Sequence, residues 1–261
     1  MKVVLWCGGQ GMRMREYSDR IPKPMVPIGI RPILWHLMRL YSHHGNKDFV
    51  LCLGYQADKI KDYFLSYREE LSNDFVLSNG GDVELLSSDI DDWNITFVDT
   101  GLSSNVGTRL FKVREHVQDE EYFLANYADG LSDVPVNGVI DKLKASGKAA
   151  AFVTVRPSQS FHLVDLEVDG TVASIGAATQ AGVWVNGGFF VLTPRVFDFM
   201  NEGEELVEEP FQRLIEAGEL LAYPYEGFWV GMDTFKDREE LDKLHAGNQA
   251  PWELWRSGSC Q

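Results

Sequence analysis

Short, uninterrupted apolar runs alternate in the first third of the chain with segments whose apolar residues recur every three or four positions. The runs at residues 3–7 and 48–53 each end at a glycine, which is typical of strands buried on both faces of a sheet. Pro32 opens a helical pattern with one apolar face, and residues 57–67 predict a second helix. This order of elements predicts a parallel sheet with right-handed crossovers.

The remainder of the chain continues the alternation of strand and helix patterns. Further strands are expected at residues 93–99, 122–126, 149–155, 163–168 and 187–193. Helices are expected at residues 107–113, 136–145, 194–200, 210–217 and 234–245. Residues 69–92 have weak periodicity and many polar side chains, which indicates an inserted loop or hairpin. No repeat or linker divides the chain, so we expect one α/β domain with a mixed sheet.

The charge balance narrows the classes of partner. With 24 Lys and Arg against 39 Asp and Glu, the net charge of −15 repels nucleic acid and anionic lipid, so neither is expected as the primary partner. An anionic small molecule would need a local pocket of cations and backbone N–H groups. The three cysteines form no CxxC motif and predict neither a disulfide framework nor a cysteine zinc site. The first apolar run is too short for a signal peptide, so we expect a cytoplasmic protein.

The strongest candidate for chemistry is the glycine-rich segment 8–13, GGQGMR, directly after the first predicted strand. Glycines allow a sharp turn that exposes N–H groups to an anion, and Arg13 can hold phosphate oxygens. Lys23 follows between two prolines, which stiffen the chain around its ammonium group. An ordinary strand-to-loop turn is the alternative. Met14 breaks the dinucleotide-binding fingerprint, and the chain has no Walker A ending.

Two aspartates are candidate metal ligands. Asp129 follows a predicted buried strand, where the ligands of open α/β sheets are found, and its carboxylate could hold Mg²⁺ against a polyphosphate. Without further information, Asp129-Gly130 is more often a plain turn. Asp233 precedes the helix predicted from Thr234, and its alternative role is the N-cap of that helix.

With these residues in view, the chain resembles the sugar-1-phosphate nucleotidyltransferases from residue 1 to about residue 255. The resemblance rests on the segments 7–13 (CGGQGMR), 23–26 (KPMV), 47–49 (KDF), 54–55 (GY), 98–101 (VDTG), 127–130 (YADG), 186–192 (NGGFFVL) and 232–234 (MDT). The segments 32–36 (PILWH) and 250–255 (APWELW) are similar to the cytidylyltransferase branch.

The resemblance implies a Rossmann-like three-layer α/β/α fold with a mostly parallel mixed sheet in one domain, residues 1–261. About residues 1–130 would bind the nucleotide and about 131–261 the acceptor. The implied reaction joins a nucleoside triphosphate, CTP favoured, to a small phosphorylated acceptor such as a sugar phosphate and releases pyrophosphate. Mg²⁺ is the implied cofactor, and a homo-oligomer is expected.

The resemblance also assigns roles to individual residues. Arg13 and Lys23 would be catalytic, the first on the leaving pyrophosphate and the second on the α-phosphate. Asp129 and Asp233 would hold Mg²⁺. The nucleotide would contact Gly8, Gly9, Gln10, Gly11, Met12, Gly54, Tyr55, Ser104 and Arg109. The acceptor would contact His162, Asn186 and Gly187.

The sequence departs from the family pattern once in the phosphate-binding segment and twice on the acceptor side. Met12 stands where the family usually has threonine, and residues 174–180 (SIGAATQ) lack the family's Glu-Lys pair. His162 replaces a glycine that packs on the sugar. An active transferase with an altered acceptor is one interpretation. An enzyme that still uses glucose 1-phosphate with its lost contacts replaced, and a non-catalytic nucleotide-binding relative, are the others. The retained phosphate cations and metal carboxylates argue against the last.

Overall fold

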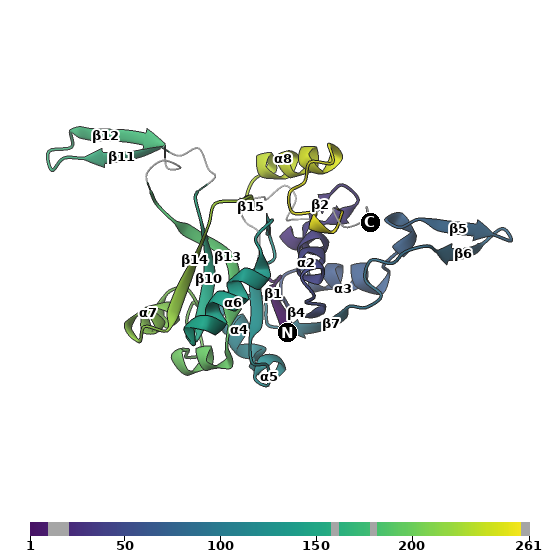
Figure 1. Cartoon of the computed structure of the whole chain (residues 1–261), viewed down its shortest axis with the longest axis horizontal. Helices are drawn as coiled ribbons and strands as arrows, with labels where there is room; N and C mark the ends of the chain where they lie inside the picture. The colour runs from purple at the N-terminus through teal and green to yellow at the C-terminus, as the bar shows by residue number, and fades with distance from the viewer. Residues whose placement is uncertain (10–20, 158–161, 178–181, 257–261) are drawn as a thin grey trace.

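The computed structural model describes residues 1–9, 21–157, 162–177 and 182–256, with only the backbone described for His162 and Ala177. A seven-stranded sheet forms its centre, in the order β14-β10-β13-β8-β1-β4-β7 (Figure 1). These strands are β1 Lys2–Trp6, β4 Asp48–Leu53, β7 Asn94–Asp99, β8 Phe123–Tyr127, β10 Ala150–Val155, β13 Val185–Leu192 and β14 Leu220–Tyr225. Only β13 runs antiparallel to its two neighbours, and the other pairs are parallel. The predicted mostly parallel mixed sheet is confirmed.

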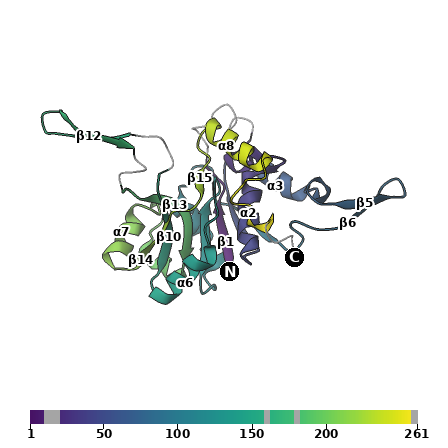
Figure 2. The ribbon, with the colours of Figure 1, turned by 45° about the horizontal axis from the view of Figure 1, so that its top comes forward.

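Strand β1 shows why the domain has three layers. It lies between β4 and β8, and its alternate side chains enter two different apolar cores. Val3 and Leu5 pack with α2 Ile33–His43, α3 Ala57–Leu65 and α6 Val136–Ser146. Val4 and Trp6 pack with α4 Val106–Lys112, α5 Arg114–Val117 and α7 Glu209–Glu216. Because successive strand residues point to opposite faces, the continuous apolar run supplies side chains to both cores. The ribbon of β1 and of the helices around the sheet can be followed in Figure 2.

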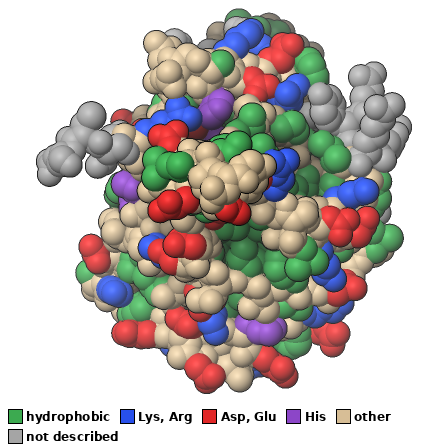
Figure 3. All heavy atoms as spheres, turned by 90° about the vertical axis from the view of Figure 1, so that its right-hand side faces the viewer, with side chains coloured by type: hydrophobic (Ala, Val, Ile, Leu, Met, Phe, Trp, Pro, Cys, Tyr) green, Lys and Arg blue, Asp and Glu red, His purple; other side chains and the backbone are tan. Residues whose placement is uncertain are grey.

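Two hairpins project from this body in opposite directions (Figure 1). The first, β5 Phe75–Ser78 with β6 Asp82–Leu85, confirms the inserted hairpin expected within residues 69–92. The second, β11 His162–Leu166 with β12 Val172–Ala177, begins at the predicted strand 163–168. Each carries exposed apolar side chains on one face. Seen from the side of the first hairpin, hydrophobic side chains gather in the middle of the molecular surface (Figure 3).

Several short elements were not expected from the sequence. They are β2 Pro27–Ile28, β3 Arg31–Pro32, β9 Gly130–Ser132, β12, β14, β15 Trp229–Gly231 and α5. Strands of two or three residues carry too little alternation to be recognised, and β14 contains a proline, which is tolerated because β14 is an edge strand. The helix predicted at residues 194–200 is a 3-10 helix at 194–199. Helix α8 Phe235–Ala246 packs through Leu241 against the core that contains Val3 and Leu5.

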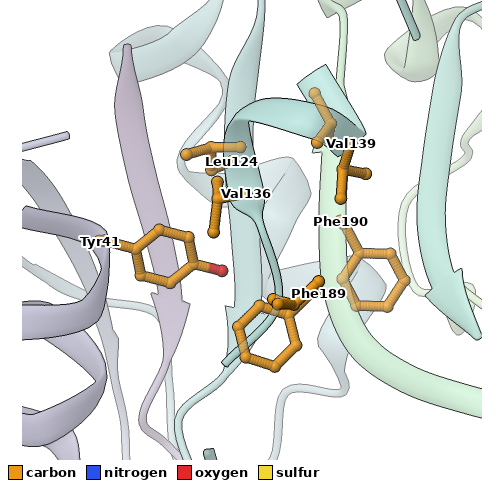
Figure 4. A pocket seen from close by; sticks show the side chains of 8 residues that line it. Tyr41, Leu124, Val136, Val139, Phe189 and Phe190 are labelled. Atoms are coloured by element: carbon orange, nitrogen blue, oxygen red, sulfur yellow. The ribbon is translucent and has the colours of Figure 1, made fainter. Parts of the chain in front are cut away.

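A small void lies in the core beside α6. Tyr41, Leu124, Val136, Val139, Phe189 and Phe190 surround about 10 Å³ of space (Figure 4). Apolar cavities of this size stay dry, so we regard it as a packing defect and not a ligand site. None of the helices in the described part of the chain has the length and apolar character that crossing a bilayer requires.

Candidate active site

Two short strands bring the predicted metal ligands together. Asp129 lies between β8 and β9, and Asp233 follows β15. Strands β9 and β15 pair with Gly130 opposite Gly231, and the backbone N–H of Met232 donates to the carbonyl of Asp129 at 2.8 Å. The two aspartates, more than 100 residues apart in the sequence, therefore sit next to each other beyond the carboxyl end of β8.

Lys23 lies between these two carboxylates. It begins the 3-10 helix Lys23–Met25, and its Nζ lies 2.7 Å from Asp129 Oδ2 and 2.8 Å from Asp233 Oδ1. Burial alone would lower the pKa of Lys23, but the two carboxylates outweigh it and the pKa is raised. The three groups form a compact charged cluster that keeps contact with solvent, since their side chains are 14%, 34% and 30% exposed.

The structure bears on the alternative roles of both aspartates. Helix α8 is capped by Thr234, whose hydroxyl accepts from the Asp237 N–H while the Asp237 carboxylate accepts from the Thr234 N–H. The Asp233 side chain is not the cap and points to Lys23 instead. Asp129 does lie at a turn between two strands, but its carboxylate also binds Lys23. Both carboxylates thus contact the Lys23 ammonium in addition to any role in local structure.

A cavity of about 190 Å³ opens beside the cluster. It is lined by Asn126, Tyr127, Asp129, Gly130, Asn186, Gly187, Trp229, Gly231 and Asp233. The predicted acceptor residues Asn186 and Gly187 and the two predicted metal ligands therefore border the same space. The cavity is smaller than the roughly 300–1,000 Å³ of typical drug-sized sites, which suits a small polar ligand.

Hydrogen bonds fix the far wall of this cavity. Trp229 Nε1 donates to the carbonyl of Gly187 at 2.7 Å, and Asn186 Nδ2 donates to the Tyr127 hydroxyl at 3.3 Å. Burial raises the pKa of Tyr127 to about 12, so its phenol stays protonated. Sequence reasoning missed Trp229 and Tyr127 as cavity residues. The sequence could have indicated them by their position, because Tyr127 lies shortly before Asp129 and Trp229 shortly before Asp233.

The glycine loop is only partly described. Gln10, Gly11, Met12 and the predicted catalytic Arg13 lie outside the described residues. Gly9 has no atom within 4 Å of the position that a Cβ would take. Gly8 is different, because an added Cβ would lie 2.1 Å from Nη1 of Arg109. Because Gly8 has no side chain, the guanidinium group of Arg109 can approach its backbone closely.

Arg109, predicted to line the nucleotide site, is buried under the ends of three strands. Its Nη2 donates to the carbonyl of Gly8 at 2.9 Å. Its Nη1 donates to the carbonyl of Leu53 at 3.1 Å and to the hydroxyl of Thr100 at 2.6 Å. These contacts tie the carboxyl end of β4 to the segments that follow β1 and β7. The structure places the guanidinium against Gly8, the first residue of the glycine-rich segment, and only 3% of Arg109 is exposed.

Other predicted nucleotide residues lie on the same strand-end loops. A Cβ on Gly54 would meet Arg109 Nη1 and the carbonyls of Gly8 and Gly101, each at 2.9 Å. The N–H of Tyr55 points to the carbonyl of Gly8 at 3.4 Å. The Ser104 hydroxyl donates to the carbonyl of Thr100 at 2.5 Å, and that carbonyl also accepts from Lys112, which the sequence did not single out.

The third predicted acceptor residue, His162, lies at the start of the β11–β12 hairpin. Its backbone pairs with Ala177, and its side chain is outside the description. The segment in which the family's Glu-Lys pair is missing overlaps the end of β12 and continues into residues that are not described. Of the altered residues that the structure describes, His162 and Ala177 belong to one hairpin, whereas the predicted acceptor residues Asn186 and Gly187 belong to the central sheet.

Comparison with known sequences gives a consistent family. The profile of the family described as "Nucleotidyl transferase" matches residues 2–243. The glucose-1-phosphate cytidylyltransferase of Salmonella typhi is 41% identical over 257 residues, covering 98% of this chain and 100% of that protein. The probable glucose-1-phosphate cytidylyltransferase of Bacillus subtilis (strain 168) is 37% identical over the same length and coverage.

Solved structures share the fold at much lower identity. A UDP-glucose pyrophosphorylase complexed with UDP-glucose matches with a TM-score of 0.69 and 17% identity, over 95% of this chain and 98% of that one. HddC from Yersinia pseudotuberculosis matches with a TM-score of 0.69 and 18% identity, over 94% and 99%. Together with the strand-end cluster and the sequence matches, these likenesses lead to one conclusion: the chain belongs to the sugar-1-phosphate nucleotidyltransferase family.

Proposed function

We propose that this chain transfers a nucleotidyl group from a nucleoside triphosphate, CTP first, to a small phosphorylated acceptor and releases pyrophosphate. The observation that carries the proposal is the placement of Lys23 between Asp129 and Asp233 at the edge of the cavity bordered by Asn186 and Gly187. A phosphate entering this cavity would meet one ammonium group and two carboxylates that can share a metal ion. That is the charge arrangement needed to bring two anions together.

Asp129 and Asp233 fit a divalent cation, and we assign them to Mg²⁺. Their oxygens are hard ligands, and Lys23 Nζ, less than 3 Å from both, shows that one positive centre can be shared between them. When bound, Mg²⁺ would neutralise phosphate charge. The ammonium of Lys23 would then turn to the phosphate, where negative charge grows during the in-line attack.

No strong general base is needed for this chemistry. The acceptor phosphate is the nucleophile and is already ionised near pH 7, so the protein's work is positioning and charge neutralisation. Because the chain carries a net charge of −15, that neutralisation must come from local cations: Lys23, together with Arg13 as predicted from the sequence. The backbone N–H groups of the glycine loop would hold the triphosphate.

The relatives' printed names support CTP as the first nucleotide to test. For the acceptor we favour a compound other than glucose 1-phosphate. The small neutral residues Ala177 and Ala178 stand where the family's Glu-Lys pair is expected, and His162 stands in place of glycine. Loss of a charge-assisted contact of about 1.5–3 kcal/mol would weaken the binding of glucose 1-phosphate. A nearby cation such as Arg156 is the competing possibility, because it could replace the lost lysine.

We also infer that the chain assembles into a homo-oligomer. A two-stranded hairpin is marginally stable by itself, and both hairpins carry an apolar face that nothing in the described part of the chain covers. The residues on these faces are Phe75, Leu77, Val83 and Leu85 on the first hairpin and Val164, Leu166, Val172 and Ile175 on the second. Sedimentation analysis of the purified chain tests this directly.

The decisive experiment is pyrophosphate release, measured with each common nucleoside triphosphate against glucose 1-phosphate and a panel of other sugar and cyclitol phosphates. We expect turnover with CTP and an acceptor other than glucose 1-phosphate. A kcat/KM of about 10⁴ M⁻¹s⁻¹ or more with glucose 1-phosphate would refute the altered acceptor. If the chain binds CTP but releases no pyrophosphate with any acceptor, the result would favour a non-catalytic, regulatory role.

A further inference from the structure

Two histidines and a glutamate from three separate segments meet beside α2. His36 lies on α2, His245 lies near the end of α8, and Glu253 directly precedes the 3-10 helix Leu254–Arg256. One potential ligand atom from each of the three lies within 4.8 Å of the other two. The set combines imidazole nitrogen and carboxylate oxygen, which zinc-class cations accept together.

The distances suit a metal ion in place of a proton. His245 Nδ1 lies 2.8 Å from Glu253 Oε1, and His36 Nδ1 lies 3.6 Å from the same oxygen. Zinc bonds of roughly 2.0–2.2 Å in a tetrahedral arrangement place ligand atoms about 3.3–3.6 Å apart. The His36–Glu253 separation lies at the upper end of that range and the His245–Glu253 separation lies below it, so small side-chain movements would complete three corners of a tetrahedron.

The groups around the cluster already orient these atoms. His36 Nε2 lies 3.0 Å from the carbonyl of Ile28 and must be the protonated nitrogen there, which leaves the Nδ1 lone pair toward Glu253. Arg256 Nε lies 2.8 Å from Glu253 Oε2 and holds the carboxylate by its other oxygen. Hydrogen bonds from a second layer to the ligating imidazole and carboxylate are typical of protein zinc sites.

Two existing contacts would give way on binding. The indole N–H of Trp252 donates to His36 Nδ1 across 3.3 Å, a long hydrogen bond for this pair. His245 Nδ1 and Glu253 Oε1 are also joined by a hydrogen bond, at 2.8 Å. A metal ion would replace both, so binding should release protons and weaken as the pH falls.

The cluster is separate from the catalytic centre and is open on one side. His36, His245 and Glu253 all line a cavity of about 600 Å³, between α2, the C-terminal segment and the base of the β5–β6 hairpin. This cavity shares no lining residue with the one beside Asp129 and Asp233. A fourth coordination position would therefore face the cavity and could hold water.

We propose that His36, His245 and Glu253 form a second metal site, specific for a zinc-class divalent cation and independent of the catalytic carboxylates. Because its ligands come from α2, α8 and the C-terminal segment, the bound ion would also fasten that segment to the body of the domain.

The test uses the full chain after treatment with a chelator, with Zn²⁺ titrated by calorimetry and Co²⁺ followed by its visible absorption. The parent protein for the titration carries Asp129→Asn and Asp233→Asn, so that the catalytic carboxylates cannot contribute. We expect one Zn²⁺ per chain, a tetrahedral Co²⁺ spectrum and a higher melting temperature with Zn²⁺. Adding His245→Gln or Glu253→Gln should weaken binding by about 100-fold or more and abolish the thermal shift.

His116→Gln is the matched control, because it removes a histidine outside the cluster and should leave Zn²⁺ affinity unchanged. His245→Gln serves as the main variant, since His245 is partly exposed and its loss should not unfold the chain, as circular dichroism would verify. The proposal is overturned if the parent binds no Zn²⁺. It is equally overturned if the folded His245→Gln variant binds with the parent's affinity and stoichiometry.

Discussion

Two cationic side chains, Lys23 and Arg109, are held by different kinds of acceptor. Lys23 is surrounded by charged acceptors, the carboxylates of Asp129 and Asp233, in a cluster that remains partly exposed. Arg109 is surrounded by neutral acceptors, two backbone carbonyls and the Thr100 hydroxyl, and is almost completely buried. The carboxylates around Lys23 border a cavity, whereas Arg109 packs against Gly8.

The difference indicates which cation can change partners. The carboxylates that hold Lys23 would bind a metal ion at least as well, so the ammonium can be released to a phosphate without leaving a buried charge unpaired. Arg109 has no such substitute, because moving it would leave the carbonyls of Gly8 and Leu53 with fewer donors in a dry environment. We therefore expect chemistry from the Lys23 cluster and mechanical support from Arg109.

The largest effect should come from Asp129→Asn. A neutral amide is a poor ligand for Mg²⁺, so pyrophosphate release should fall by a factor on the order of 10³ or more, while the urea midpoint stays close to that of the unmodified protein. Asp141→Asn, which changes an exposed carboxylate on α6, is the control and should retain full activity. Near-normal turnover in the folded Asp129→Asn variant would remove the distinction between the two clusters.

Lys23→Met should lower turnover by a factor on the order of 10², since a preorganised charge is lost at the phosphate. It should also increase the affinity of the free protein for Mn²⁺, measured by electron paramagnetic resonance, because the competing ammonium is gone. Lys142→Met on α6 provides the control. Unchanged Mn²⁺ affinity in the Lys23→Met variant would show that Lys23 does not compete for the metal position.

Arg109→Met should reduce stability instead. Removing three hydrogen bonds donated to buried acceptors should lower the free energy of unfolding by about 2–4 kcal/mol, read from urea denaturation. The folded fraction should keep a larger share of its activity than Asp129→Asn does. Arg114→Met, at an exposed arginine on α5, should change stability by no more than about 0.5 kcal/mol. If Arg109→Met were as stable as the control, the support role would be wrong.

The smallest effect should separate two adjacent glycines. Gly8→Ala places a methyl group against the Arg109 guanidinium and should cost about 1–3 kcal/mol of stability. Gly9→Ala meets no atom of the described structure within 4 Å and should stay within about 0.5 kcal/mol of the unmodified protein. Paired urea curves decide the matter, and equal losses at the two positions would mean that Arg109 does not press on the loop.

Much of the layered architecture was predictable because it depends on local periodicity. The strand at 48–53 was predicted with the bounds that the structure has, and the helices at 57–67 and 136–145 differ from it by one or two residues. A run of apolar residues determines which faces must be buried, whatever lies opposite. For the same reason Asp129 could be placed at a strand end before its partners were known.

Contacts between distant segments depended on the tertiary structure. The pairing of β9 with β15, strands of three residues each, sets Asp233 beside Asp129. The loop that carries Lys23 then places its ammonium between them, across sequence separations of 106 and 210 residues. Such short segments have too little periodicity for their pairing to be predicted from the sequence. Only the folded structure could show that Lys23, Asp129 and Asp233 form one cluster.

By itself, then, the sequence determined the order of most of the longer strands and helices, the burial of the first strands on both faces and the types of residue available for phosphate chemistry, because each depends on neighbours along the chain. The tertiary structure decided which charges meet. It placed Arg109 against Gly8, Trp229 in the cavity wall and Glu253 beside two histidines. Burial and distance decide whether a charged side chain is a ligand or a support, and both are properties of the folded chain.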